Sequence, residues 1–325
     1  MEQQLSFAAG EYAGKKKTTR REKFLGQMEE VVPWSRLVAL IEPHYPKGLR
    51  GRPPVGVERM LRVYFLAQWY GLADEALEDS LYDSQALRTF AGIDLGRDPV
   101  PDATTLLHFR HLLEAHGLAK AIFEEVGGHL EEKKLSMREG TIVDATIIAA
   151  PSSTKNRERE RDPDMHQTRK GNQWYFGMKA HIGVDAQSGL VHHVVGTAAN
   201  VSDVSQTRAL LHGGEKSVHA DAGYQGADKR PEMDLANIQW QIAAKRGKIK
   251  AMAEGAQKEL LKQCERAKAQ VRSLVEHPFH IIKNLFKHRK LRYRGLAKNT
   301  AQLHVLFALA NLVMASRRLN ATAVA

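Results

Sequence analysis

A strand-like run with one carboxylate in its middle constrains this chain more than any other feature. The run extends from Gly140 to Ala150, and its residues are almost all apolar or β-branched, which is typical of a strand buried on both faces. Asp144 is its single charge. A buried, unpaired carboxylate is costly unless its pKa rises, hydrogen bonds surround it or a cation binds it. We therefore expect Asp144 to hold metal together with carboxylates from elsewhere in the chain.

The charge of the chain favours a polyanionic partner. Its 325 residues include 48 Lys and Arg against 37 Asp and Glu, a formal net charge of +11, which suits nucleic acid or an acidic membrane surface. No apolar run reaches the roughly 18 residues of a transmembrane helix, and the first residues lack the apolar core of a signal peptide. The single cysteine, Cys264, excludes a disulfide framework and a cysteine-rich zinc module. These features predict a cytoplasmic protein that uses no membrane.

The sequence pattern predicts three parts. Residues 1–54 form a basic arm and a breaker-rich linker, residues 55–134 a helical unit, and residues 135–325 a unit of strands and helices. Short helices with tight turns in the second part are consistent with a helix-turn-helix-like module, in which His108, Arg110 and His111 could face DNA. In the third part, three predicted strands, residues 140–150, 174–185 and 190–198, can form a meander and precede strands linked by helices. This order predicts an α/β fold with a mixed sheet flanked by helices.

The N-terminal arm contains a dense basic cluster, with six Lys or Arg residues among the nine from Lys15 to Lys23. Two compatible interpretations are open: the solvated start of a helix, or an arm that binds DNA phosphates. The second interpretation assigns DNA contacts to Lys15, Lys16, Lys17, Arg20 and Arg21.

Two further carboxylates can join Asp144. Asp221 follows the short predicted strand Ser217–Ala220, at the strand end where α/β sheets place functional groups. The first and fourth strands can be neighbours, so Asp144 and Asp221 can meet. The polar stretch 151–173 between the first two strands is expected to be a loop or flap.

The third carboxylate is Glu276. Arg272 lies four residues before it and Lys283 seven residues after it, so all three share one face of a helix. The acid would bind an ion, while the two bases would bind DNA phosphates. Pro278 predicts a kink or a helix start close to Glu276.

Each acid also has a plain structural interpretation, as a hydrogen-bonded Asp or as part of a surface ion pair. Two other aspartates compete for the site, but Asp185 fits a turn and Asp203 the first turn of a helix. A zinc site of His219 and Asp221 is a further alternative.

The motifs resemble those of the DDE transposases of bacterial insertion sequences, and of the insertion-sequence-five family in particular. The resemblance covers nearly the whole chain. It rests on Asp144 in its strand, on Asp221 in Ala-Asp-Ala-Gly-Tyr-Gln-Gly, on Arg272, Glu276 and Lys283, and on the stretches Ala-Pro-Ser-Ser-Thr-Lys-Asn, Met-Lys-Ala-His-Ile-Gly-Val-Asp, Val-Glu-His-Pro-Phe and Arg-Tyr-Arg-Gly-Leu-Ala-Lys-Asn.

The resemblance implies a ribonuclease-H-like core and an enzyme that binds the terminal inverted repeats, frees 3′-OH ends and joins them to target DNA. It implies two Mg²⁺ ions, with Mn²⁺ as a substitute, at Asp144, Asp221 and Glu276. Double-stranded DNA would be the partner, a dimer or higher oligomer the active form, and the bacterial nucleoid the place of action. Related families have a tyrosine three residues before the arginine; here that residue is Ala269, so the tyrosine's role is not transferred.

Two alternatives remain open. A stand-alone nuclease or junction resolvase would share the fold and the metal chemistry. A non-catalytic DNA-binding descendant would share only the fold, although the three intact acids argue against it.

Overall fold

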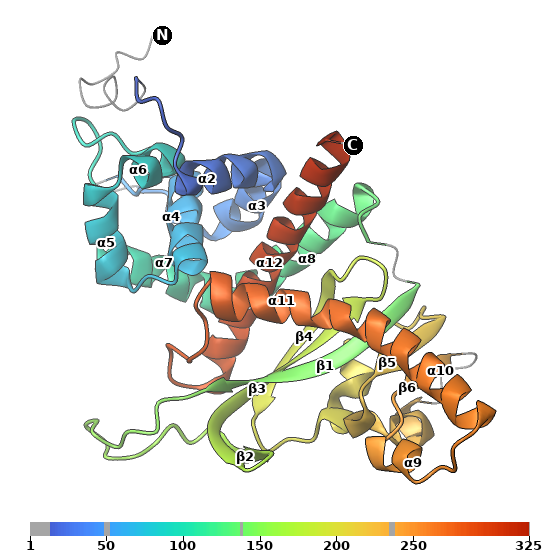
Figure 1. Ribbon diagram of the computed structural model, residues 1–325. Coiled ribbons are helices and arrows are strands. Elements are labelled where there is room, and N and C mark those ends of the chain that lie inside the picture. Colours follow the sequence, from blue (N-terminus) through green and yellow to red (C-terminus); the bar gives the residue numbers. More distant parts are fainter. Residues whose placement is uncertain (1–13, 49–52, 137–138, 234–237, 325) are drawn as a thin grey trace. The chain divides into compact units, whose positions relative to one another are not determined.

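The computed structural model describes residues 14–48, 53–136, 139–233 and 238–324. The chain divides into two compact units (Figure 1): unit 1 contains residues 1–126 and 312–325, and unit 2 contains residues 127–311. Two portions of the predicted N-terminal arm and linker, residues 1–13 and 49–52, lie outside the described residues.

Unit 1 is helical, as the apolar spacing predicts. Its helices are α2 (Arg20–Val31), α3 (Trp34–Ile41), η1 (Glu42–His44), α4 (Val57–Tyr70), α5 (Asp74–Asp83), α6 (Gln85–Ala91) and α7 (Ala103–Ala115); α8 (Leu118–Glu132) and α12 (Leu296–Val324) belong partly to each unit. Gly71 ends α4 at φ +65°, and the side chain of Asp102 caps α7 by accepting from Thr105 N–H, as expected.

Aromatic side chains form the core of unit 1. Trp69 and Phe65 are almost fully buried, and the Trp69 ring contacts the edges of Phe24 and Phe90. The basic cluster begins this unit: Thr19 and Glu22 form a capping box at the start of α2. The predicted helix start is therefore confirmed.

Unit 2 is built on a six-stranded sheet with the order β2-β3-β1-β5-β6, in which β4 also pairs with β3. The strands are β1 (Gly140–Ala149), β2 (His166–Lys170), β3 (Gln173–Asp185), β4 (Val191–Ala198), β5 (Ser217–Ala220) and β6 (Gln239–Ile242). β1, β3 and β4 pair in antiparallel fashion, whereas β5 is parallel to β1 and β6 is parallel to β5. The predicted mixed sheet and its meander are confirmed.

The sheet is covered on both faces. On one face, Val143, Val218 and Tyr224 form a buried cluster with residues of the 3₁₀ helix η2 (Asp203–Leu210). On the other face, α12 approaches so closely that a Cβ on Gly196 of β4 would lie 2.2 Å from Thr300 Oγ1. Asn311 of α12 also exchanges two hydrogen bonds with the backbone of Val191.

The helical segment after β6 consists of several short elements. They are α9 (Arg246–Lys250), α10 (Ala256–Arg272), η6 (Ser273–Val275), α11 (Glu276–His280) and the π-helical turn η7 (Ile281–Leu285). Figure 1 shows α10 and α11 following one another across β1. The α-helix restarts at Glu276, with Pro278 in its first turn, so the irregularity predicted from Pro278 is confirmed.

The expectation for residues 151–173 was wrong in part. The stretch contains β2, whose five residues pair with Gln173–Gly177 of β3. The preceding loop is tied down: Asp162 and Asp164 accept from the backbone N–H groups of Gly295 and Leu296 at the start of α12. These carboxylates lie at the positive end of the helix dipole, which stabilises the loop.

Candidate active site

β1 brings Asp144 to the middle of the sheet of unit 2. Asp144 pairs with Ile182 of β3, and its half-buried side chain accepts from Ala145 N–H at 2.7 Å. Burial, together with the negative charges of Asp221 and Glu276, raises the pKa of the Asp144 carboxyl to about 7, against the lowering effect of the Ala145 hydrogen bond. Asp221 and Glu276 therefore each lie within electrostatic range of Asp144, as does Asp203.

The parallel register explains why Asp221 is near Asp144. The ladder between β1 and β5 pairs Thr141 with Val218 and Ile142 with His219. Continued by two residues, the same register puts Asp221 opposite Asp144. Asp221 is the first residue after β5 and caps a short 3₁₀ helix, with its Oδ1 accepting from Gly223 N–H at 2.8 Å.

Glu276 reaches the same region from the helical segment. Its exposed side chain lines a pocket of about 520 Å³ together with Thr146 of β1, Tyr175 of β3 and Lys283. Thr146 is two residues from Asp144, so both side chains lie on the same face of β1. The pocket therefore lies on Thr146, on the face of β1 that carries Asp144, and Glu276 lines it from the helical segment.

Lys283 fixes the helical segment to β1. Its ammonium group donates to Thr146 Oγ1 and to the carbonyl of Ile147. Burial lowers the pKa of Lys283, and the nearby charge of Lys170 lowers it further, whereas Glu276 and Asp144 raise it. Arg289 also lines the pocket. The rim thus combines one carboxylate, Glu276, with the cations Lys283 and Arg289, which can bind phosphates.

The three carboxylates are suitable ligands for a divalent ion, but in the structure they do not stand as a closed group of ligands. Among the described residues, no group of three His, Cys, Asp or Glu side chains stands close enough to hold an ion. Hard carboxylate oxygens are the ligands that Mg²⁺ prefers. Burial is the main cause of the raised pKa of Asp144, and the charges of nearby acids add to it; a cation bound to the carboxylate would favour its charged form and offset both effects.

The competing acids have other partners. Asp185 accepts from Ser188 Oγ and Gln187 N–H in the turn after β3, as predicted. Asp203 forms an ion pair with Lys179 at 2.9 Å. At the predicted zinc alternative, Nε2 of His219 contacts Ser217 Oγ at 3.3 Å.

The other predicted DNA-binding residues are spread over both units. Arg272 is half-buried at the end of α10, and Lys16, Lys17 and Arg20 are exposed at the start of α2. Lys15 forms an ion pair with Glu22. Arg21 lies over the Tyr70 ring and donates to Ser84 Oγ, so it packs on its own unit.

On α7, the sequence suggested that Arg110 could face DNA, and this was wrong. Arg110 is buried and donates two hydrogen bonds to the carboxylate of Asp74, a bidentate ion pair. Its neighbours His108 and His111 are exposed.

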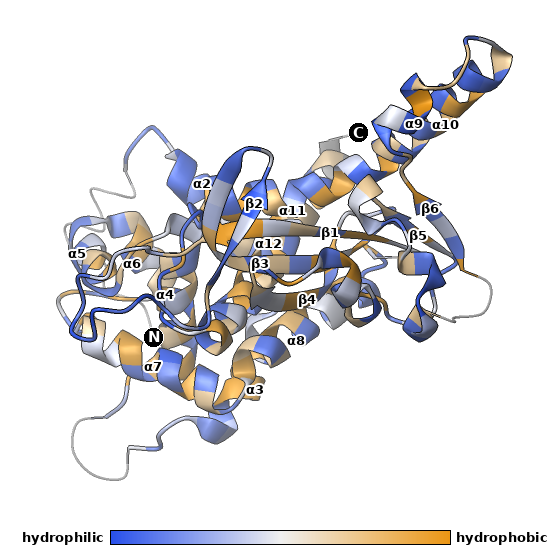
Figure 2. Ribbon diagram, turned by 90° about the horizontal axis from the view of Figure 1, so that it is seen from below, coloured by the Kyte–Doolittle hydropathy of each residue, from blue (hydrophilic) through white to orange (hydrophobic). Residues whose placement is uncertain are grey.

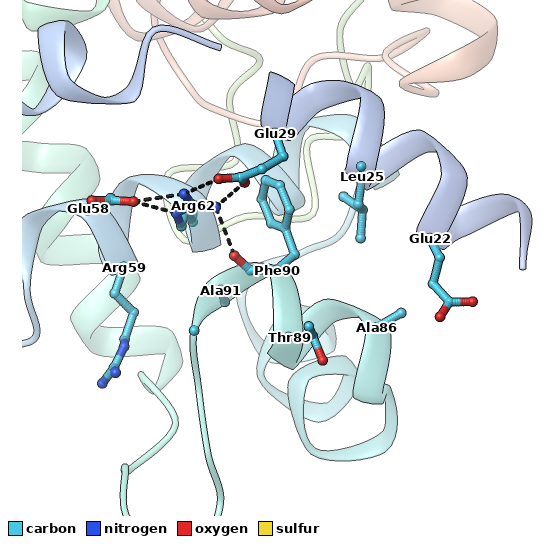
Figure 3. A pocket seen from close by; sticks show the side chains of 12 residues that line it. Glu22, Leu25, Glu29, Glu58, Arg59, Arg62, Ala86, Thr89, Phe90 and Ala91 are labelled. Carbon is cyan, nitrogen blue, oxygen red and sulfur yellow. Dashed lines mark hydrogen bonds and ion pairs between the residues drawn. The ribbon is translucent and has the colours of Figure 1, made fainter. Parts of the chain in front are cut away.

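Unit 1 contains a larger pocket of about 630 Å³ that does not fit a phosphate (Figure 3). The guanidinium of Arg62 is held by Glu29 and Glu58 and donates to the carbonyl of Phe90. With Glu22 also on the rim, the carboxylates outnumber the available cations. This pocket would repel a DNA backbone.

No helix in the described parts of the chain combines the length and the apolar character needed to cross a lipid bilayer.

Two family models match the chain. The model described as the transposase DDE domain matches residues 135–312, which include β1, β5 and the helical segment with Glu276. A second model, described as a transposase domain (DUF772), matches residues 13–112, most of unit 1. Both are typical of bacterial insertion-sequence transposases, which are metal-dependent enzymes that cut DNA and transfer its strands. The first match alone covers more than half of the sequence, and the chain therefore belongs to the DDE-domain transposases.

Proposed function

We propose that this transposase binds the terminal inverted repeats of an insertion sequence, frees their 3′-OH ends and joins these ends to target DNA. Asp144, Asp221 and Glu276 are the catalytic carboxylates. The observation that carries the proposal is geometric: the register of β1 and β5, continued by two residues, brings Asp221 opposite Asp144, and Lys283 joins the segment that carries Glu276 to Thr146 and Ile147 of β1. The stretches around the three acids support membership of the insertion-sequence-five family.

The three carboxylates would hold two Mg²⁺ ions, with Mn²⁺ as a substitute. Their oxygens suit these hard cations, and the charges that now oppose one another would be compensated. Bound in this way, such ions activate an oxygen nucleophile and stabilise the leaving oxygen of an in-line displacement. Asp144 is the residue assigned to both ions, Asp221 to one and Glu276 to the other.

The protein's own groups position the DNA strand. Lys283 uses two N–H groups on Thr146 and Ile147, which leaves the third donor of its ammonium group for a phosphate oxygen. Arg272, four residues before Glu276, is assigned to the flanking phosphate. Water is the first nucleophile and the freed 3′-OH the second, so the same residues serve both steps.

The remaining assignments concern architecture and partners. We assign residues 1–54 to an arm and linker, with Lys15, Lys16, Lys17, Arg20 and Arg21 on the DNA backbone. Residues 55–134 are assigned to end binding or dimerisation, and residues 135–325 to catalysis. Since two ends are processed together, the active form would be a dimer or higher oligomer on DNA in the bacterial cytoplasm.

The test is cleavage and joining of a plasmid that carries the sequences flanking the gene. Asp144→Asn, Asp221→Asn and Glu276→Gln should each abolish cleavage in Mg²⁺ or Mn²⁺ and leave DNA binding largely intact. Asp228→Asn, at an exposed carboxylate of another helix, is the matched control. Cleavage retained by any of the three variants removes that acid from the site. Cleavage without joined product would indicate a stand-alone nuclease.

A further inference from the structure

A two-stranded arm leaves the sheet beside the candidate active site. We call residues 166–176 the β2–β3 arm: β2, the turn at Gly171 and Asn172, and the first four residues of β3. β1 pairs with β3 only from Gly177 onward, whereas β2 pairs with residues 173–177. Figure 2 shows the arm as a largely hydrophilic element.

The β2–β3 arm has no buried core of its own that would stabilise it. All five β2 residues, and residues 173–176 of β3, are exposed or half-buried. An isolated two-stranded hairpin is at best marginally stable in water. The arm is fixed at its base, where β3 passes β1 so closely that a Cβ on Gly177 would lie 2.1 Å from the Ile148 carbonyl oxygen. Its surface is therefore available for a partner.

One side chain of the arm belongs to the pocket of Glu276. Tyr175 lines that pocket with Lys283 and Arg289, and its hydroxyl donates to Gln173 Oε1 at 2.8 Å. Lys170, at the end of β2, lies close enough to influence the charge of Lys283. A strand that reaches Glu276 would thus pass along the arm.

The residue before Tyr175 carries an exposed aromatic ring. Trp174 exposes 63% of its surface, in contrast to Trp69 with 2%. It faces Arg169 across the ladder, and further along β3 the Arg161 guanidinium lies over the Phe176 ring. Successive residues of a strand point to opposite sides, so Trp174 and Tyr175 give the arm two different surfaces. An exposed indole beside an arginine leaves a large apolar surface in contact with water, which is unfavourable unless a partner covers it.

Aromatic rings with neighbouring cations bind single-stranded nucleic acid. The ring stacks on a base and the cations bind the phosphates, without dependence on sequence. Inside a duplex, both faces of each base are already covered by its neighbours. A stacking ring therefore selects a nucleotide that has left the duplex.

We propose that the β2–β3 arm binds an unpaired segment of DNA on the surface that carries Trp174 and Arg169, with Trp174 stacked on one of its bases, while Tyr175 on the other surface lines the pocket beside Glu276. The inference rests on the proposed function, because it assigns that pocket to DNA. It also specifies the form of the DNA that is bound: the bases next to the bond that is cut are unpaired.

Binding of the full-length protein to a labelled oligothymidylate of about 15 nucleotides tests this inference. A fully paired duplex of the same length is measured beside it, with both in EDTA so that no cleavage occurs. Trp174→Ala should weaken oligothymidylate binding about 5- to 150-fold, the equivalent of about 1–3 kcal/mol. Trp174→Phe should keep most of the affinity, and duplex binding should change by less than about twofold, since paired bases offer no free face.

Leu260→Ala is the matched control, because Leu260 of α10 is equally exposed at 63%. Unchanged oligothymidylate binding by Trp174→Ala would overturn the inference. So would an equal loss for both DNA forms, which indicates a groove contact, or a change confined to self-association, which indicates a protein interface.

The two proposals fail separately. If plasmid cleavage requires the three acids while Trp174→Ala binds oligothymidylate like wild type, the arm inference alone is wrong. If Trp174 discriminates between the DNA forms while the acids prove dispensable, the proposed catalytic site alone is wrong.

Discussion

The ammonium group of Lys283 donates a hydrogen bond to the backbone carbonyl of Ile147, 3.0 Å away. This bond joins the helical segment that carries Glu276 to the strand that carries Asp144. Lys283 thus joins the two elements that carry the acids we propose as catalytic, although these acids are far apart in the sequence.

Lys283→Met should destabilise the protein by about 1–3 kcal/mol even without DNA. The change removes two hydrogen bonds that the ammonium group donates to half-buried acceptors, the Ile147 carbonyl and the Thr146 hydroxyl, and the loss of hydrogen bonds from a charged group costs about that much. Urea unfolding measures the effect. Lys298→Met, at an exposed position of α12, is the control. Equal stability of both variants would show that Lys283 serves DNA alone.

Asp144→Asn should stabilise the metal-free protein at neutral pH. The folded state raises the pKa of Asp144 from 3.8 to about 7, so between these values the folded state retains a proton that the unfolded state releases. The free energy of unfolding of the wild type therefore falls as pH rises from about 4 to 7, and the penalty is fully present above pH 7. Asn cannot ionise and carries no such penalty.

Urea titrations in EDTA measure this difference at two pH values. We expect Asp144→Asn to exceed the wild type by about 1–4 kcal/mol at about pH 8, since one pKa unit is worth about 1.4 kcal/mol, and to match it near pH 4. Asp228→Asn should show no such pH-dependent gain. A constant offset at both pH values would point to packing rather than charge.

Divalent cations should stabilise the wild type without DNA. An ion that binds only the folded state adds about 2.7 kcal/mol when its concentration is about 100 times the dissociation constant. The unfolding temperature should therefore rise with Mg²⁺ or Mn²⁺ in the wild type and much less in Asp144→Asn. A rise of the same size in both would place the ion elsewhere.

Arg272→Ala should weaken DNA binding and reduce its dependence on salt. Each lost phosphate contact lowers the slope of log K against log salt concentration by about 0.7–0.9. Binding titrations at several salt concentrations give the slope, with Arg266→Ala on the exposed surface of α10 as the control. A slope that does not change would assign Arg272 to a structural ion pair.

The sequence predicted much of unit 2 because its strands are apolar and their ends are marked by turns. β1, β3, β4 and β5 all lie within about two residues of their expected places. The exception is β2, whose residues His-Gln-Thr-Arg-Lys bury nothing and therefore lack an alternating pattern. The Gly171-Asn172 turn was the signal that could have found it, since this dipeptide between two runs is typical of a hairpin.

The sequence also predicted the three acids, but not the groups that surround them. Nothing in the spacing of Lys283 shows that it binds the backbone of β1, because that contact joins residues 136 apart in the sequence. Tyr175 was missed for the same reason: only the pairing of β3 with β1 brings it to the pocket of Glu276. The prediction for Arg110 failed because helical spacing does not reveal its partner Asp74 on another helix.

The ladder between β1 and β5 ends at Ile142 and His219, two residues before Asp144 and Asp221. Asp144 remains clamped by β3 on its other side, paired with Ile182, whereas Asp221 is past the last rung and is held by a short turn. The two acids are thus held in different ways, Asp144 by the ladder with β3 and Asp221 by the turn that follows β5. If both bind an ion, as we propose, a change in the turn at Asp221 would adapt the site to Mg²⁺ or Mn²⁺ and leave the β1–β3 ladder unchanged.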